Sequence, residues 1–163
     1  MPDPDPERAY ATALRILSYR FNSEAELRRK LRAKKFEAED IDETLARLRR
    51  ESWLDDDRFA AAFVRARSAK RVGPLRIRRE LGVAGVEEEV IERALAANSD
   101  DEASEAALGD LCAKRMRIVA RRYGQEYLST EEGRQRVAAY LVRQGYDLGD
   151  VLGAINHSMR SEE

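Results

Sequence analysis

Three consecutive aspartates, Asp55, Asp56 and Asp57, are the side chains in this sequence that come nearest to a metal site. Carboxylates bind hard cations, but a complete calcium site needs about 6–8 oxygen ligands. No cluster of glutamates or histidines lies nearby in the sequence to supply the others. A structural role accounts for all three, because Asp55 can cap a helix whose first turn holds the other two near the positive end of its dipole. Leu54 and Phe59 have the spacing of a hydrophobic staple around that cap, so we expect a helix start and no metal.

The rest of the chain offers no catalytic constellation. His157 is the only histidine, which excludes a metal site built from several histidines. Cys112 lies in an apolar stripe, so we expect a buried small hydrophobe and not a reactive thiol. The glycines within residues 82–85 are not followed by the Lys–Ser/Thr pair of a phosphate-binding P-loop. The sequence therefore predicts neither an enzyme nor a bound cofactor.

Basic residues are clustered although the chain carries almost no net charge. The 30 lysines and arginines nearly balance the 31 aspartates and glutamates, so general attraction to DNA or anionic lipid is not indicated. Three stretches nevertheless lack any acidic residue: 28–35, 65–79 and 114–122. The candidate contacts to a partner or to DNA are Arg65, Arg67, Lys70, Arg71, Arg76, Arg78, Arg79, Lys114, Arg115 and Arg117. Arginine suits both, since its planar guanidinium binds carboxylate or phosphate with two hydrogen bonds; the alternative is that these are ordinary solvated helix faces.

Aromatic side chains near basic residues can add base stacking, which proteins that bind single strands commonly use. Tyr123 and Tyr127 follow the third basic stretch, but packing in the core or in a loop is the favoured interpretation for both. Trp53 is expected to be a buried anchor between repeats and not a platform for a ligand.

The elements that position these residues follow from an internal repeat. Five apolar residues recur three times with the same successive spacings of 4, 5, 5 and 4. The three sets are Leu27, Leu31, Phe36, Ile41 and Leu45; Ile77, Leu81, Val86, Ile91 and Leu95; and Val137, Leu141, Tyr146, Val151 and Ile155. Residues four apart share a helix face, so each set predicts two helices joined at its middle residue.

Glycine precedes the middle residue in the second and third sets, at Gly85 and Gly145. This pattern predicts the left-handed backbone that ends many helices and that glycine adopts without strain. The first set has Lys35 there, which costs roughly 1 kcal/mol if the backbone is left-handed. Acidic residues follow in every set, and they suit the positive end of the next helix.

A further amphipathic segment precedes each pair of helices, so each copy contains three helices. These segments span residues 8–19, 55–70 and 100–122. Capping-box patterns begin at Ser23, Ser99 and Ser129, and Pro74 fits a first helical position. A copy of about 45 residues is marginal alone, because so small a domain buries too little surface, whereas stacked copies share their cores.

We therefore expect an all-α fold of three tandem three-helix repeats that form an elongated, curved helical array. The expected parts are a disordered tail at residues 1–8 and repeats at 9–53, 54–98 and 99–160, the third with a longer first helix or loop. No apolar run reaches the ~18 residues that a membrane span requires. With no signal-peptide pattern and a single cysteine, a cytoplasmic protein is expected.

Short strings in the first two copies carry a resemblance to a known family. The first copy contains Ala13-Leu14-x-x-Leu17-x-x-Arg20 and Glu26-Leu27-x-x-Lys30-Leu31. The second contains Leu54-Asp55-Asp56, Arg58-Phe59-Ala60, Gly73 and Ile77-x-x-Glu80-Leu81. Together they resemble the RecX family, bacterial regulators of the RecA recombinase. The resemblance covers about residues 9–160 and is weakest in the third copy.

The resemblance implies a regulatory protein, not an enzyme, that binds RecA and the RecA–single-stranded-DNA filament. It also implies inhibition of filament growth, ATP hydrolysis and strand exchange, and hence modulation of recombination, DNA repair and the SOS response. Contact with single-stranded DNA and a monomeric state are further expectations. The alternative is an autonomous helical DNA-binding module, against which the balanced charge argues.

Overall fold

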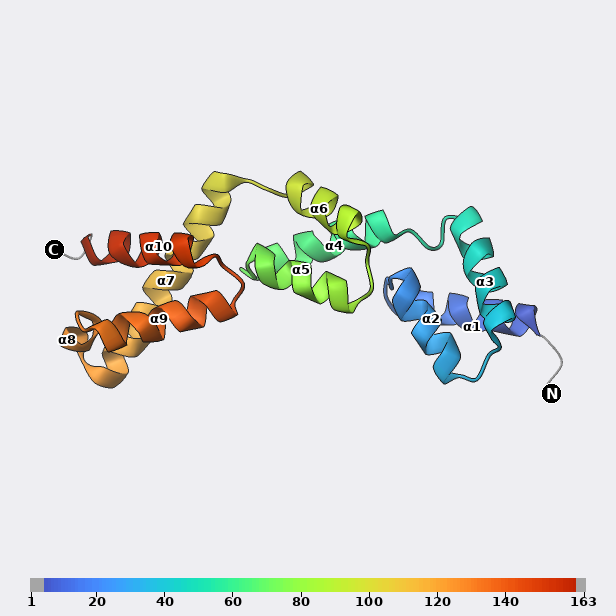
Figure 1. The fold of residues 1–163 in the computed structure, drawn as a ribbon, viewed down its shortest axis with the longest axis horizontal. Coiled ribbons are helices and arrows are strands. Elements are labelled where there is room, and N and C mark those ends of the chain that lie inside the picture. The colour runs from blue at the N-terminus through green and yellow to red at the C-terminus, as the bar shows by residue number, and fades with distance from the viewer. Residues whose placement is uncertain (1–4, 161–163) are drawn as a thin grey trace. The chain divides into compact units, whose positions relative to one another are not determined.

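Ten α-helices and no strand make up residues 5–160, the part of the chain that this computed structural model describes (Figure 1). The helices are α1 (Pro6–Tyr19), α2 (Glu24–Ala33), α3 (Ala38–Arg50), α4 (Asp56–Ser68), α5 (Pro74–Val83), α6 (Glu88–Ala97), α7 (Asp101–Tyr123), α8 (Gln125–Leu128), α9 (Glu131–Arg143) and α10 (Leu148–Arg160). The expected all-α fold is confirmed, and no helix within residues 5–160 is both long and apolar enough to span a membrane.

The chain divides into two units, each with its own packing. Unit 1 comprises Met1–Phe63 and Glu80–Ala94, and unit 2 comprises Val64–Arg79 and Leu95–Glu163. The division passes through α4, α5 and α6, so the second predicted copy contributes helical segments to both units.

Unit 1 contains α1, α2 and α3, which pack around one apolar core (blue to teal in Figure 1). Four residues of the first repeat set are completely buried in it: Leu27, Leu31, Ile41 and Leu45. The fifth, Phe36, is half-buried against the same core. The repeat spacing therefore predicted this core correctly, because it selects the residues on one face of each helix.

Unit 2 has a core between α7, α9 and α10, which lie against one another in Figure 1. It buries the whole third repeat set: Val137, Leu141, Tyr146, Val151 and Ile155. Cys112 is fully buried among them, and burial raises the pKa of its thiol, which confirms its expected role as a small hydrophobe. The helix α7 has 23 residues, against 14 in α1 and 13 in α4, and the short helix α8 follows it.

One docking contact occurs twice, at corresponding positions of the repeat. In unit 1 the Ser23 hydroxyl donates to the Ala84 carbonyl, and in unit 2 the Gly73 N–H donates to the Gln144 carbonyl over 2.8 Å. The two donors are 50 residues apart and the two acceptors 60 apart, which are the offsets of the repeat itself. In each case the N-terminus of the second helix of one copy binds the turn that follows the second helix of the next copy. The helix α2 binds the turn after α5, and α5 binds the turn after α9. Free N–H groups at a helix start need such partners.

This docking explains where the repeat requires glycine. Gly85 and Gly145 have φ of 79° and 99°, as predicted, and a Cβ built on them would overlap Ala25 and Arg76 respectively. Glycine is therefore required twice over, for its backbone conformation and for the space. Lys35 has the same left-handed backbone, with φ of 68°, but its side chain is exposed. Its turn makes no such docking contact with a helix start within residues 5–160, so only the backbone strain applies there.

In the third copy the corresponding docking position is already covered. Gly133 lies 60 residues after Gly73, and a Cβ built on it would overlap the Tyr127 carbonyl, next to the core residue Leu128 of α8. The segment that carries α8 thus occupies the place where the turn of a further copy would dock. Terminal repeats of helical arrays commonly differ from internal ones because they must be closed in this way.

The tail predicted at residues 1–8 is wrong for its last three residues. Residues 1–4 lie outside the described residues, as do 161–163, but α1 already begins at Pro6. The Asp5 carboxylate accepts a hydrogen bond of 2.9 Å from the Arg8 N–H, which caps the helix. Proline at a first helical position stabilises a start, because the N–H that it lacks would have no partner there.

Two of the three predicted capping boxes are wrong by one residue. Ser23 caps α2 as expected, accepting from the Glu26 N–H at 3.1 Å, and α5 begins at Pro74 as expected. Ser99 and Ser129 instead belong to the turns that end α6 and α8, since their own N–H groups donate backward to those helices. The residues that follow them, Asp100 and Thr130, cap α7 and α9 over 3.0 Å.

The docking turn of unit 2 can be tested with a single added methyl group. We expect Gly145→Ala to lower the free energy of unfolding by about 2–4 kcal/mol, because it adds both left-handed strain and an overlap with Arg76. Gly153→Ala is the matched control: nothing lies near its added Cβ, and alanine favours the interior of α10, so stability should rise by about 0.5–1 kcal/mol. Urea unfolding followed by circular dichroism measures both, and a Gly145→Ala variant as stable as the parent would refute the docking role.

At the corresponding turn of the first copy we expect the opposite change in stability, because there the strained residue is not a glycine. Lys35→Gly should stabilise the protein by about 0.5–1 kcal/mol, because it relieves the left-handed strain and removes no buried contact. Lys34→Gly, one residue earlier at a φ of −86°, relieves no strain and should destabilise it slightly. Equal effects of the two changes in the same unfolding assay would contradict this explanation.

Candidate partner-binding surface

The three adjacent aspartates each have a separate structural partner. The partners are the Arg58 N–H for Asp55 at 3.0 Å, the Glu24 N–H for Asp56 at 2.8 Å, and the Arg93 guanidinium for Asp57 at 2.7 Å. Burial raises the pKa of Asp56, while its hydrogen bond from Glu24 opposes that shift. The cap at Asp55 is confirmed, and Leu54 and Phe59 are both buried beside it.

Asp56 adds a contact that the sequence did not predict. It belongs to the first turn of α4 but binds the first turn of α2, at the residue next to Ser23. It therefore supplies a second hydrogen bond at the N-terminus where unit 1 holds the turn that contains Ala84. Among residues 5–160 no group of three histidines, cysteines, aspartates or glutamates could hold a metal ion.

All ten basic candidates lie in unit 2, and three of them are engaged in holding it together. Arg71 pairs with Asp110 of α7 at 3.0 Å, and its carbonyl accepts a 3.0 Å hydrogen bond from the Tyr146 hydroxyl. Burial raises the pKa of Tyr146, so that hydroxyl stays protonated and remains a donor at neutral pH. These contacts fix the turn between α4 and α5 against α7 and against the turn before α10.

Arg76 and Arg115 are likewise engaged in contacts within the unit. The Arg76 guanidinium donates to the Gln144 side-chain carbonyl over 3.4 Å, at the docking turn. The guanidinium carbon of Arg115 lies 4.4 Å from the centre of the Tyr140 ring, and its Nε is buried without a hydrogen-bond partner in the described part of the chain. Arg67 and Arg78 are half-buried and also interact with other residues. These four arginines are poorly placed to exchange their contacts for a partner.

The remaining candidates are exposed and make no ion pair with any residue in 5–160. They are Arg65 and Lys70 at the end of α4, Arg79 on α5, and Lys114 and Arg117 on α7. Lys114 follows Asp110 by four residues and precedes Arg117 by three, so all three share one face of α7. The Arg71–Asp110 pair therefore brings the turn after α4 to the end of the basic face on α7. Two stretches that are separate in the sequence therefore meet at this pair. We call the five exposed residues the free basic set: Arg65, Lys70, Arg79, Lys114 and Arg117.

Tyr127 is packed as the favoured interpretation expects, whereas Tyr123 is 42% exposed although its ring contacts that of Tyr127. Their ring centres are 4.9 Å apart, and Tyr127 packs against the core of unit 2. The guanidinium carbon of Arg136 lies 4.8 Å from the centre of the Tyr123 ring and its Nη1 donates to the Tyr123 hydroxyl. Neither ring is available for stacking without loss of these contacts.

The three most exposed aromatic side chains of residues 5–160 lie elsewhere, in unit 1. Tyr19, Phe21 and Trp53 are 83%, 56% and 55% exposed. The expectation that Trp53 is a buried anchor is wrong: Ser52 adopts a left-handed φ of 60°, and the turn buries Leu54 in place of the tryptophan. These three positions stand outside the repeat spacing, which is the one signal in the sequence that could have indicated their exposure.

Comparison with known proteins finds both family models and related sequences that match this chain. The models of the first and second three-helix domains of RecX match residues 9–48 and 55–95. The regulatory protein RecX of Xanthomonas axonopodis pv. citri (strain 306) is 37% identical over 142 residues, which cover 87% of this chain and 82% of that protein. The regulatory protein RecX of Escherichia coli (strain SE11) is 34% identical over 149 residues, covering 85% and 84%.

Solved structures agree with the fold. A crystal structure of regulatory protein RecX aligns with a TM-score of 0.76 at 27% identity, over 93% of this chain and 71% of that one. RecX from Lactobacillus salivarius aligns with a TM-score of 0.78 at 22% identity, over 93% and 95%, and supports the fold alone. Tandem three-helix domains, the matched domain models and relatives that are more than one-third identical over most of their length lead to one conclusion: the chain belongs to the RecX family of regulatory proteins.

Proposed function

We propose that this chain binds the RecA recombinase and its filament on single-stranded DNA, and that it limits filament growth, ATP hydrolysis and strand exchange. In this role it modulates recombination, DNA repair and the SOS response as a cytoplasmic monomer without catalysis of its own. Membership of a family of regulatory proteins supports the proposal. The observation that carries it is the free basic set of unit 2, whose charges no acidic residue within 5–160 neutralises.

The charge balance of the chain favours a target that is recognised locally. With a net charge of −1, the protein is not drawn to DNA from a distance, so affinity must arise where the free basic set meets phosphates or carboxylates. A protein filament assembled on DNA presents both kinds of anion side by side. Arginine binds either of them with its planar fork, and Arg65, Arg79 and Arg117 supply three such groups.

Inhibition then follows from occupancy. A chain bound across neighbouring RecA subunits holds them in one arrangement and occupies space that a second DNA duplex needs for strand exchange. If the chain acts by binding alone, inhibition should saturate with the number of bound chains. A ligand can shift such an equilibrium only by its difference in affinity between the free and the assembled states.

ATP hydrolysis by RecA on single-stranded DNA measures the proposed activity directly. We expect the rate to fall and reach a plateau as this protein is added, because each bound chain removes filament sites from the active pool. Strand exchange between a single strand and a duplex can be measured in the same titration. We expect its rate to fall in parallel with the rate of ATP hydrolysis. An unchanged rate at a several-fold molar excess over RecA would refute the proposal.

Reversing charges of the free basic set should weaken inhibition without unfolding the protein. In the variant Arg79→Glu/Lys114→Glu/Arg117→Glu we expect about a tenfold higher concentration for half-maximal inhibition, since an exposed ion contact contributes about 0.2–1 kcal/mol and reversal adds repulsion. The changes avoid Arg71 and Arg76, which hold unit 2 together. Circular dichroism should show the helix content of the parent.

A matched control carries the same change of charge on other helices. Arg134→Glu/Arg143→Glu/Arg160→Glu replaces three exposed arginines of α9 and α10. It should inhibit as well as the parent if location matters and not net charge alone. Equal loss in both variants would show that the free basic set has no special role.

A further inference from the structure

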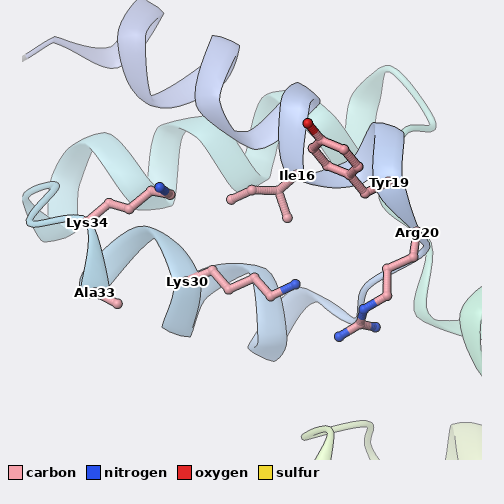
Figure 2. A pocket seen from close by; sticks show the side chains of 6 residues that line it. All are labelled: Ile16, Tyr19, Arg20, Lys30, Ala33 and Lys34. Atoms are coloured by element: carbon pink, nitrogen blue, oxygen red, sulfur yellow. The ribbon is translucent and has the colours of Figure 1, made fainter.

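An open hollow of about 510 Å³ lies between α1 and α2 in unit 1. Six residues line it: Ile16, Tyr19, Arg20, Lys30, Ala33 and Lys34 (Figure 2). Two are apolar, one is aromatic and three are basic, and none is acidic. The hollow lies outside the free basic set of unit 2, so the proposed surface for RecA does not account for it.

The aromatic residue of the hollow is left to solvent. Tyr19 ends α1 and is 83% exposed, and it makes no hydrogen bond or ring contact with any residue in 5–160. Figure 2 shows its ring beside Ile16, whose side chain points from α1 toward α2. A large ring of this kind normally gains about 1.5–3 kcal/mol by burial. Here a ligand with a flat apolar face could provide that burial.

The three basic residues follow one side of the hollow. Lys30 lies on α2 and Lys34, four residues later, caps the C-terminus of that helix, a rise of about 6 Å. The Lys30 Nζ donates to Asn22 Oδ1 over 2.6 Å, and Asn22 is itself 97% buried, since only 3% of it is exposed. Lys30 is therefore held in place by a rigid partner. Lys34 is exposed, and Figure 2 shows its side chain extending over the hollow.

The charges in the hollow are only partly compensated. Arg20 pairs with Glu26 at 3.1 Å, so its charge is shared with a carboxylate just outside the lining. Figure 2 shows Lys30 extending along α2 toward Arg20, and the nearby positive charge of Arg20 adds to burial in lowering the pKa of Lys30. An anion placed between the two would relieve their repulsion.

We propose that this hollow binds a nucleotide of single-stranded DNA, with its base stacked on Tyr19 and against Ile16, and its phosphates on Lys30 and Lys34. The combination of an exposed ring, an apolar floor and a row of cations fits a base joined to phosphates. An acidic peptide would use the cations and leave the ring unused. This inference deepens the proposed function and rests on it, because the RecA filament is where the chain would meet the single strand.

Two further exposed rings lie in unit 1. Phe21 and Trp53 line a second hollow, together with Leu17, Glu51, Ser52 and Arg58. The guanidinium carbon of Arg58 lies 5.6 Å from the centre of the Phe21 ring, which leaves a cation beside an aromatic face here as well. Successive bases of one strand could stack on these rings without base-specific hydrogen bonds, so the site should tolerate any sequence.

Binding of a fluorescein-labelled oligothymidylate, measured by anisotropy over a range of salt concentrations, tests the assignment. Tyr19→Ala should weaken binding about tenfold without changing the salt dependence, because it removes stacking and no charge. Tyr19→Phe, which keeps the ring, should bind within about twofold of the parent. Lys34→Gln should lower the slope of log K against log[salt] by about 0.7, the value for one phosphate contact on a single strand.

A photocrosslink locates the base. An oligonucleotide that carries 5-iodouracil should give an adduct on the peptide containing Tyr19, and the adduct should be lost in Tyr19→Ala. Unchanged circular dichroism and unchanged fluorescence of Trp53, the only tryptophan, would show that the variant is folded. No measurable binding by the parent at low salt, equal affinity of Tyr19→Ala and the parent, or an adduct confined to unit 2 would each overturn the inference.

The RecA assay separates the two proposals. If the parent protein inhibits RecA while Tyr19→Ala binds the oligonucleotide like the parent, the hollow is no nucleotide site and the proposed function stands. If the parent binds the oligonucleotide through Tyr19 but leaves RecA unaffected, the hollow stands and the proposed function fails. If Tyr19→Ala loses inhibition but keeps its affinity for the oligonucleotide, the hollow contacts protein and the inference is wrong.

Discussion

Each unit of this protein depends on a contact at one helix start, the N-terminus of α2 in unit 1 and the N-terminus of α5 in unit 2. At each of them the free N–H groups or the capping side chain of a helix start bind the carbonyls of a turn from the next copy, through Ser23 in unit 1 and Gly73 in unit 2. A three-helix copy is too small to be stable alone, so its persistence depends on this sharing. Glycine at the docking turns is a consequence, because only a turn without a Cβ can approach a helix start so closely.

This constraint also sorts the basic residues into two kinds. Arg71 holds the turn before α5 against Asp110, and Arg76 on α5 holds the turn between α9 and α10 through Gln144. Their loss should affect the fold before it affects any partner. Arg79, Lys114 and Arg117 contribute nothing comparable to unit 2, and they are therefore free to serve recognition. A stretch that is uniformly basic in sequence thus contains two kinds of residue: some stabilise the fold of unit 2, and others are exposed and free to bind a partner.

The sequence predicted what depends on local periodicity. The 4-5-5-4 spacing identified the buried residues because apolar residues four apart share a helix face, and it located the left-handed turns at Lys35, Gly85 and Gly145. It could not predict partners that come from distant segments. The hydrogen bond from the Glu24 N–H to Asp56 joins residues 32 positions apart, and the pair of Arg71 with Asp110 joins residues 39 apart.

The candidate sites depended on such distant partners and on single turns. Whether Arg71 or Lys70 is free is decided by an aspartate on α7, which no pattern within residues 65–79 contains. Trp53 is exposed because one left-handed residue, Ser52, redirects the chain so that the neighbouring leucine takes the core position. Propensity carries no signal for serine in that conformation, so the aromatic surface of unit 1 became visible only in the structure.

Lysine labelling on the assembled filament tests the central claim, that the free basic set of unit 2 meets RecA and its DNA. The chain has only five lysines, Lys30, Lys34, Lys35, Lys70 and Lys114, so an amine-reactive reagent and mass spectrometry can follow each of them. When the protein is bound to RecA filaments on single-stranded DNA, Lys70 and Lys114 should lose reactivity relative to the free protein, while Lys35 retains it. Retention of full reactivity at both Lys70 and Lys114 in a filament that is demonstrably occupied would contradict the account.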